Sequence, residues 1–204
     1  MKLSWYGHSC FKLETQDGSV IFDPYAPGSV PGLELPALSA DMVLCSHKHS
    51  DHSYPQGVKQ TRRKPELDIQ RLSTFHDGKR GALRGENTVT IVEGEGLRVA
   101  HFGDLGHMLS PEQLEELGHI DVMLVPVGGY YTIDAKQAAE LVRAVKPLVT
   151  VPMHYRGAGF GYDVIAPVED FLALSENIKY FDSNVLELSG IREPITALLK
   201  YPVI

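Results

Sequence analysis

A dense group of metal-ligating side chains occupies residues 47–52, whose sequence is His-Lys-His-Ser-Asp-His. Imidazole nitrogens and carboxylate oxygens are suitable ligands for Zn²⁺ and comparable divalent ions. In an extended loop, residues i and i+2 project to the same side, so His47 and His49 can bind one ion together. Asp51 and His52, where we expect the chain to turn into a helix, can face a second ion. This spacing predicts a metal site rather than a polar surface loop.

Six residues cannot complete two coordination spheres, so further ligands must come from other parts of the chain. Three candidates each lie just past an apolar, strand-like run: His76, Asp104 and His154. Gly103, directly before Asp104, permits an unusual backbone angle. Functional groups are commonly mounted in this way, on loops that a rigid scaffold positions.

The elements that would position these residues are strand-rich in the first half of the chain, and strands alternate with helices in the second. Strands are expected at residues 3–5, 10–13, 20–22, 41–46, 69–75, 87–92, 97–102, 121–127, 148–151 and 185–188. Helices are expected from the Ser110 cap to Gly118, over 134–145 and around 167–174, whereas the tail from Ile191 is ambiguous. This order predicts an α/β sandwich formed by one domain over residues 1–204.

Net charge, cysteine content and the lengths of the apolar runs narrow the classes of function and the expected location of the protein. The formal net charge of −7 argues against a general nucleic-acid binder. The basic cluster at residues 59–64 is interpreted as a solvated loop, with a phosphate-contacting lip as the alternative. Cys10 and Cys45 lie in apolar segments and are expected to be free thiols, with one disulfide as the alternative. The N-terminus lacks a signal-peptide core and no apolar run approaches membrane length, so a soluble, cytoplasmic enzyme without a membrane partner is expected.

The run from His47 to His52 resembles the HxHxDH signature of the metallo-β-lactamase superfamily. The resemblance extends along nearly the whole chain. It includes residues 5–9, 22–24, 103–107, 126–129 and 152–155, and the Arg-Gly-x-Asn string at 84–87, all similar to the single-domain branch that includes the ascorbate-6-phosphate lactonase. The resemblance implies a metallo-β-lactamase-like αββα four-layer sandwich. The segments 56–65 and 191–204 match no member of the family, and they are candidates for deciding the substrate.

The resemblance also implies a role for each candidate ligand. His47, His49 and His76 would hold a first metal ion, Asp51, His52 and His154 a second, and Asp104 would bridge the two. Asp23 would support the site without binding metal, and Asp51 would also orient the nucleophile as a catalytic residue. Zinc is the expected metal, with manganese or iron as alternatives.

Three more residues are candidate substrate contacts. His8 lies in a tight turn, where it either touches the substrate or is a buried, hydrogen-bonded histidine. His107 is close to Asp104 in sequence and is either a substrate contact or a support for a ligand. Tyr131 follows two glycines and either closes over a bound anion or packs in a plain turn. His101 and His119 are expected to be structural.

These features predict a metal-dependent hydrolase in which two ions share a water and lower its pKa. Two divalent ions outweigh Asp51, Asp104 and a hydroxide by about one positive charge, which favours an anionic small molecule. An ester, a lactone or a phosphorylated metabolite is expected as substrate. The alternative is a phosphodiesterase or nuclease with the same dinuclear site. Phospholipid hydrolysis, oxygen chemistry and non-catalytic metal binding fit the sequence less well, and a homo-oligomer stays open.

Overall fold

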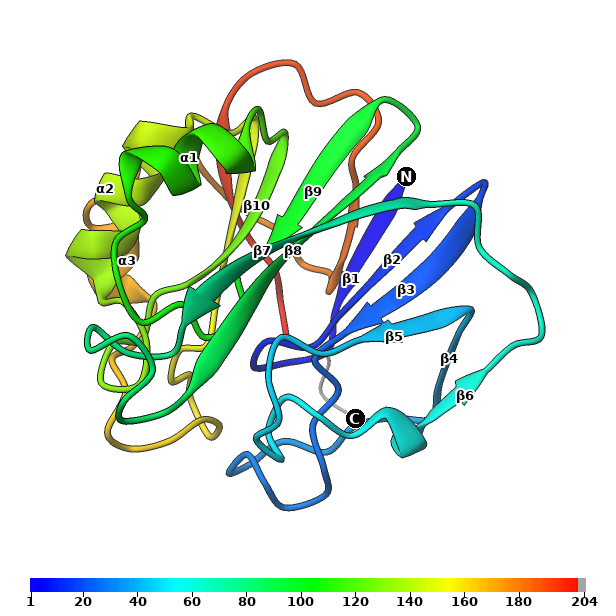
Figure 1. The fold of residues 1–204 in the computed structure, drawn as a ribbon, viewed down its shortest axis with the longest axis horizontal. Coiled ribbons are helices and arrows are strands. Elements are labelled where there is room, and N and C mark those ends of the chain that lie inside the picture. Colours follow the sequence, from blue (N-terminus) through cyan, green and yellow to red (C-terminus); the bar gives the residue numbers. More distant parts are fainter. Residues whose placement is uncertain (202–204) are drawn as a thin grey trace.

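The computed structural model describes residues 1–201, and its centre is formed by two β-sheets that face each other (Figure 1). The first sheet has the order β13-β1-β2-β3-β5. Its strands are β1 (Lys2–Trp5), β2 (Phe11–Thr15), β3 (Gly18–Phe22), β5 (Met42–Leu44) and β13 (Val185–Glu187). Neighbours from β13 to β3 are antiparallel, whereas β5 runs parallel to β3. The carboxyl ends of β3 and β5 therefore lie at the same edge of the sheet.

The second sheet has the order β12-β14-β11-β10-β9-β8-β7. Its strands are β7 (Asp68–Phe75), β8 (Glu86–Gly94), β9 (Leu97–His101), β10 (Val122–Pro126), β11 (Val149–Met153), β12 (Ile178–Tyr180) and β14 (Ile195–Leu198). Strands β9 to β12 and β14 are parallel to one another, and β8 is antiparallel to both of its neighbours, β9 and β7. Every residue of β10 and β11 is buried, as expected for central parallel strands.

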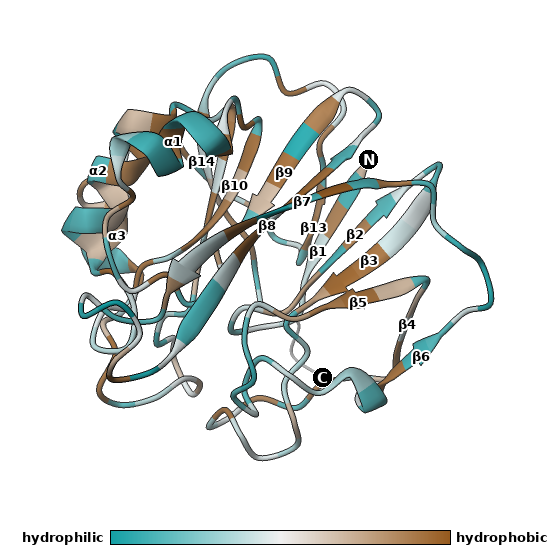
Figure 2. Cartoon of the chain, viewed as in Figure 1, coloured by the Kyte–Doolittle hydropathy of each residue, from teal (hydrophilic) through white to brown (hydrophobic). Residues whose placement is uncertain are grey.

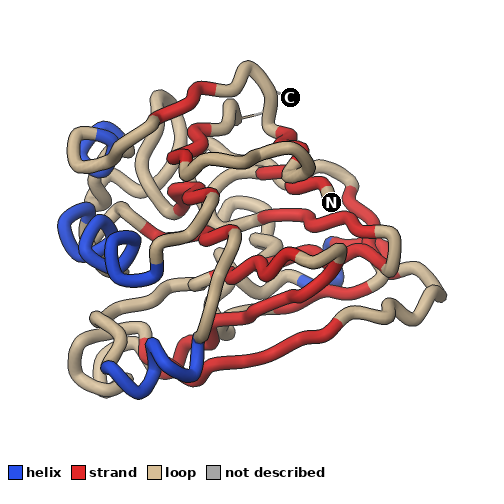
Figure 3. Tube along the Cα trace, turned by 90° about the horizontal axis from the view of Figure 1, so that it is seen from above, coloured by secondary structure: helices blue, strands red, loops and turns tan. Residues whose placement is uncertain are grey.

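The three α-helices found within residues 1–201 lie together on one side of the molecule, against the seven-stranded sheet (Figures 1 and 3). They are α1 (Pro111–Leu117), α2 (Ala135–Val145) and α3 (Glu169–Leu172). The first two begin with capping boxes at Ser110 and Asp134, which satisfy the free backbone N–H groups of the first turn. Apolar residues of the strands fill the space between the layers (Figure 2).

The outer face of the five-stranded sheet is covered differently. Because side chains alternate along a strand, Val20 and Phe22 face the main core, whereas Ile21 faces a second apolar cluster. That cluster includes residues of β4 (Leu38–Ala40) and β6 (Val58–Gln60), which form a small parallel sheet. The α/β sandwich expected from the sequence is confirmed. Within residues 1–201 no α-helix covers this face, and β4, β6 and the 3₁₀ helix η1 (Pro55–Gly57) lie there with the adjoining loops.

The prediction that a helix begins at Asp51 and His52 is wrong. The segment forms bends and a turn, in which His52 N–H donates to the His49 carbonyl (3.0 Å). The Ser50 carbonyl accepts from Ala26 N–H (2.8 Å), and Tyr54 N–H donates to the Pro24 carbonyl (2.8 Å). These bonds tie the segment to the loop after β3, so its backbone groups are not available for a helix.

Strands β4, β6, β12 and β14 were not expected from the sequence, and the other strands confirm their predictions to within a few residues. No helix within residues 1–201 is both long enough and apolar enough to cross a membrane.

Candidate metal centre

The predicted ligands all follow the ends of strands that point toward one edge of the molecule. Residues 47–52 follow β5, and Asp23 follows β3. In the second sheet His76 follows β7, Asp104 follows β9 and His154 follows β11. Strands β7, β9 and β11 run in the same direction, so their carboxyl ends meet at one edge, where open α/β sheets commonly place their binding sites.

Two sets of donor atoms lie at this edge, and a third group, Asp23, His47 and His52, overlaps both. One set is His47, His49 and His76, and the other is His8, Asp51, His52 and His154; within each set the donor atoms lie within 4.8 Å of one another. Asp104 lies between the sets. Its Oδ1 is 3.2 Å from Nε2 of His52, and its Oδ2 is 3.1 Å from Nε2 of His76 and 3.3 Å from Nε2 of His154. The structure thus brings together all seven residues that the sequence predicts as ligands.

Several of these donor atoms lack a hydrogen-bond partner within residues 1–201, which fits a metal site. Nε2 of His47, His52 and His154 and Oδ1 of Asp104 are buried and find no hydrogen-bond partner within residues 1–201. Buried polar atoms are normally paired, so several unpaired ones directed at one point require an explanation. Nε2 of His52 and Oδ1 of Asp104 are 3.2 Å apart yet make no hydrogen bond. Divalent cations bound by the two sets would satisfy these atoms.

Hydrogen bonds behind three of the histidines fix which ring nitrogen faces the centre. Nδ1 of His52 donates to Oδ2 of Asp23 (2.7 Å), and Nδ1 of His76 donates to the Tyr131 carbonyl (3.1 Å). The Ser46 hydroxyl donates to Asp23 (2.6 Å), and its oxygen accepts from Nδ1 of His47 (2.9 Å). Each ring therefore keeps the proton on Nδ1 and directs the lone pair of Nε2 inward, which is the arrangement that orients histidine ligands of metals.

Burial keeps several of these imidazoles neutral, as metal binding requires. Burial and then the neighbouring His154 lower the pKa of His8 to about 4. Burial and then His52 lower the pKa of His47 to about 3. Burial alone would raise the pKa of Asp104, but the nearby His154 and His52 hold it well below its ordinary value. Asp104 is therefore an anion surrounded by imidazole rings, and this charge arrangement favours a cation.

Burial would likewise lower the pKa of His52, but the carboxylates of Asp104 and Asp23 together raise it well above its ordinary value. Burial would raise the pKa of Asp51, but its contact with His8 and the neighbouring His52 lower it. The second set thus contains one carboxylate, that of Asp51, which remains ionised although it is largely buried.

The backbone around the centre is locally strained. His8, Asp23 and His154 adopt left-handed φ angles of 49°, 42° and 52°. Such angles are uncommon for residues other than glycine and cluster at functional sites. Gly103 has a φ of 55°, which confirms the expected unusual angle, and a Cβ there would collide with the side chains of Asn87 and Ser46.

A cavity of about 410 Å³ opens onto the donor atoms. It is lined by His49, Ser50, Asp51, His76, Arg84, Asp104, Tyr131 and Tyr162. Tyr131 thus lines the pocket, and its carbonyl supports His76, whereas closure of Tyr131 over a bound anion stays a prediction. Tyr162 was not expected from the sequence: its hydroxyl lies 3.2 Å from Oδ2 of Asp51. It comes from the irregular loop between β11 and α3, which carries no motif at this position.

The other candidate substrate contacts lie elsewhere. His8 is buried beneath the pocket, with Nε2 3.4 Å from Oδ2 of Asp51, and belongs to the second donor set. His107 does not line the pocket: one ring nitrogen accepts from Phe75 N–H (3.1 Å) and the other faces the Met108 carbonyl (2.8 Å). A direct substrate contact by either histidine stays a prediction.

The residues expected to be structural behave as such. His101 bonds to the Ser9 carbonyl (2.8 Å) and stacks on Phe22, and His119 is an exposed partner of Asp121. Cys10 and Cys45 are both free.

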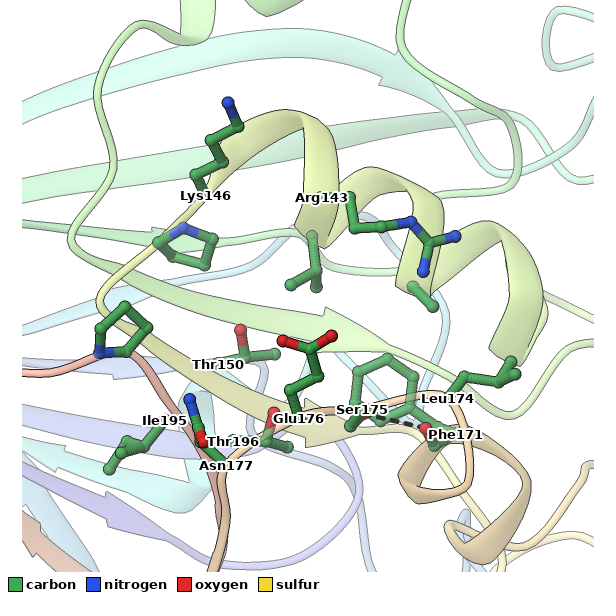
Figure 4. A pocket seen from close by; sticks show the side chains of 14 residues that line it. Arg143, Lys146, Thr150, Phe171, Leu174, Ser175, Glu176, Asn177, Ile195 and Thr196 are labelled. Atoms are coloured by element: carbon green, nitrogen blue, oxygen red, sulfur yellow. Dashed lines mark hydrogen bonds between the residues drawn. The ribbon is translucent and has the colours of Figure 1, made fainter.

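A separate cavity of about 380 Å³ lies between α2, α3 and β14 (Figure 4). Phe171, Leu174 and Ile195 form part of its wall, and none of the candidate ligands lines it. It is therefore distinct from the metal centre.

The fold and the donor set together define a metallo-β-lactamase-type metal site. In agreement, the sequence pattern of the β-lactamase superfamily domain matches residues 2–154. The chain belongs to this superfamily.

Relatives in other organisms agree with this assignment. A UPF0173 metal-dependent hydrolase of Thermoplasma acidophilum is 28% identical, over 87% of this chain and 92% of its own length. One from Archaeoglobus fulgidus is 32% identical, over 76% and 83%. A crystal structure from Thermotoga maritima, described as a proposed zinc-dependent hydrolase of the metallo-β-lactamase superfamily, has a TM-score of 0.77 and 36% identity over 98% of this chain and 99% of that chain. The protein is therefore a metal-dependent hydrolase.

Proposed function

We propose that the chain hydrolyses a small anionic ester, lactone or phosphorylated metabolite with two divalent metal ions. His47, His49 and His76 would hold one ion, and Asp51, His52 and His154 would hold the other. Asp104, which lies close to residues of both sets, would contribute to both. The observation that carries this proposal is the presence of two sets of donor atoms with the Asp104 carboxylate within 3.3 Å of His52, His76 and His154.

When bound, such a pair of ions supplies a water of lowered pKa and polarises the group under attack. The chain's own residues do the rest. Asp51 is ionised, is 16% exposed in its side chain and lines the pocket, so it can orient the attacking water and accept its proton. Asp23 and Ser46 hold the imidazoles in their ligating tautomer, and Tyr131 and Tyr162 shape the pocket.

The finer identity is part of the same proposal. Histidine-rich sets favour zinc, with manganese or iron as alternatives. The resemblance to the ascorbate-6-phosphate lactonase makes lactones the first substrates to try. We further propose that residues 1–204 work as one domain, in the cytoplasm, and that the substrate is not a nucleic acid.

The test is elemental analysis of protein purified without chelator, together with a panel of lactones, esters, phosphomonoesters and bis-p-nitrophenyl phosphate. About two metal equivalents per chain are expected, with hydrolysis of lactones or esters. Asp104→Asn should lose metal and activity, whereas Glu115→Gln, an exposed change on α1, should lose neither. Activity on the phosphodiester alone would favour the phosphodiesterase alternative. Absence of metal and of activity after zinc or manganese is added would refute the proposal.

A further inference from the structure

The pocket contains a positively charged side chain that the ligand assignment does not use. Arg84 is the one lysine or arginine among its described lining residues. The guanidinium lies over the ring of Tyr131, 5.5 Å from its centroid, and within residues 1–201 it forms no ion pair with a carboxylate. A cation that is partly buried and stacked in this way retains its N–H groups for a ligand.

The backbone of Arg84 is fixed by an unusual loop. The carboxylate of Asp77 accepts four backbone N–H bonds, from Lys79 (2.7 Å), Gly81 (3.0 Å), Leu83 (2.9 Å) and Arg84 itself (2.8 Å). These bonds fold the segment after β7 around one side chain.

This loop is also attached to the metal centre. The Gly85 carbonyl, next to Arg84, accepts from His76 N–H (3.0 Å). On the side-chain side, Tyr131 packs edge-on against Tyr162 at 5.8 Å, and the Tyr162 hydroxyl reaches Asp51. Arg84 is thus held relative to one candidate ligand in each set, through its backbone and through its side chain.

We propose that Arg84 is the anion-binding residue of this pocket and pairs with a carboxylate or phosphate group of the substrate that is not the group being hydrolysed. The planar guanidinium offers two parallel N–H donors, which match the oxygens of either group. The inference rests on the proposed function for the location of the reacting group, and it adds a specific subsite to it. It requires the substrate to carry two functional groups: one that reacts at the metal centre and one anionic group that anchors it.

The experiment is isothermal titration of the zinc-loaded protein with three probes: succinate, 3-phosphonopropionate and propionate. All three carry one carboxylate, and only the first two carry a second anionic group. The variants are Arg84→Gln, Arg84→Lys and Lys79→Gln. The last removes the same charge from an exposed position of the same loop and serves as the matched control. Bound zinc is measured in each variant.

Wild type is expected to bind at least one of the two-anion probes more tightly than propionate. Arg84→Gln should weaken that binding about 10- to 100-fold, the range for a charge-assisted hydrogen-bonded pair, and should leave propionate binding unchanged. Arg84→Lys should restore part of the affinity because it keeps the charge without the fork, and Lys79→Gln should behave as wild type. Loss confined to succinate identifies a carboxylate anchor, and loss confined to 3-phosphonopropionate identifies a phosphate anchor.

Equal binding of all probes by wild type, or an Arg84→Gln variant that binds as wild type or loses its zinc, would overturn the inference. These outcomes are distinct from failure of the proposed function. If that function fails, the wild type lacks hydrolysis or a pair of metal ions, whatever the behaviour of Arg84.

Discussion

The buried carboxylate of Asp23 offers a direct test of how the metal centre is held. It is fully buried, and its Oδ2 accepts from the Ser46 hydroxyl (2.6 Å) and from Nδ1 of His52 (2.7 Å), while its Oδ1 accepts from Ser46 N–H (2.7 Å). Asp23→Asn preserves the shape but replaces one acceptor oxygen by an NH₂ donor. If the remaining oxygen faces Ser46 N–H, the new NH₂ group faces the His52 ring.

His52 can accept from this NH₂ group only if its proton moves from Nδ1 to Nε2. That tautomer removes the lone pair that points at the metal centre. If the amide flips, the NH₂ group instead meets Ser46 N–H, and two donors oppose each other. Loss of such an orienting partner typically costs 10- to 100-fold in metal affinity, or about 1.4–2.7 kcal/mol. We expect this loss at the ion that binds His52 and a smaller one at the ion that binds His47.

The assay is competition for zinc with a chromophoric chelator, which resolves the two binding steps. Asp41→Asn is the matched control. Asp41 also accepts from a backbone N–H and a hydroxyl, those of Ser19 (2.8 and 3.0 Å), but it touches no candidate ligand. Unchanged affinity for both ions in Asp23→Asn, or an equal loss in Asp41→Asn, would refute the tautomer argument.

Three further changes test other parts of the structure. Gly103→Ala should lower the free energy of unfolding by about 3 kcal/mol in a urea titration, since it adds a steric clash to a left-handed backbone. Gly96→Ala, also at positive φ but in open space, should lower it by about 1 kcal/mol, and equal losses in the two variants would contradict this prediction. Asp77→Ala leaves four backbone N–H groups without their acceptor and should speed tryptic cleavage of the loop that follows, so an unchanged cleavage rate would argue against its organising role. Burial raises the pKa of the thiols of Cys10 and Cys45, so neither thiol should react readily with Ellman's reagent at pH 8 in the folded protein. Two thiols should react after the protein is unfolded, and a count of zero would indicate a disulfide.

The sequence was sufficient to predict which candidate ligands lie together, because their signal is local. The run from His47 to His52 carries three histidines and an aspartate in six residues. His76, Asp104 and His154 each stand where an apolar run ends, and parallel strands bring such positions to one edge. The cap at Ser110 is a local signal as well, and α1 begins where it predicts. Helix α2 lies within the expected range 134–145, and its capping box at Asp134 is seen in the structure.

The features that could not be read from the sequence depend on contacts between distant segments. Strand β14 pairs with β11 and β12 in a stretch that reads as an ambiguous tail, because a short strand at this position has no alternation of its own. The contact between Tyr162 and Asp51 joins residues 111 positions apart. His8 was expected at a turn near the site's edge, but only the packing of the two sheets shows that it lies beneath Asp51.

The strained residues at the centre indicate what the two sheets contribute to function. His8 and His154 both have left-handed backbones, and they are joined by a hydrogen bond from His154 N–H to the His8 carbonyl (3.3 Å). One comes from the turn before β2 in the first sheet and the other from the end of β11 in the second. Left-handed residues other than glycine cost about 1–3 kcal/mol each, and they persist only where the surrounding structure determines them. The packed core between the sheets supplies that constraint. The second donor set is therefore assembled across the sheet interface, as is the first, in which His47 and His49 follow β5 of the first sheet and His76 follows β7 of the second.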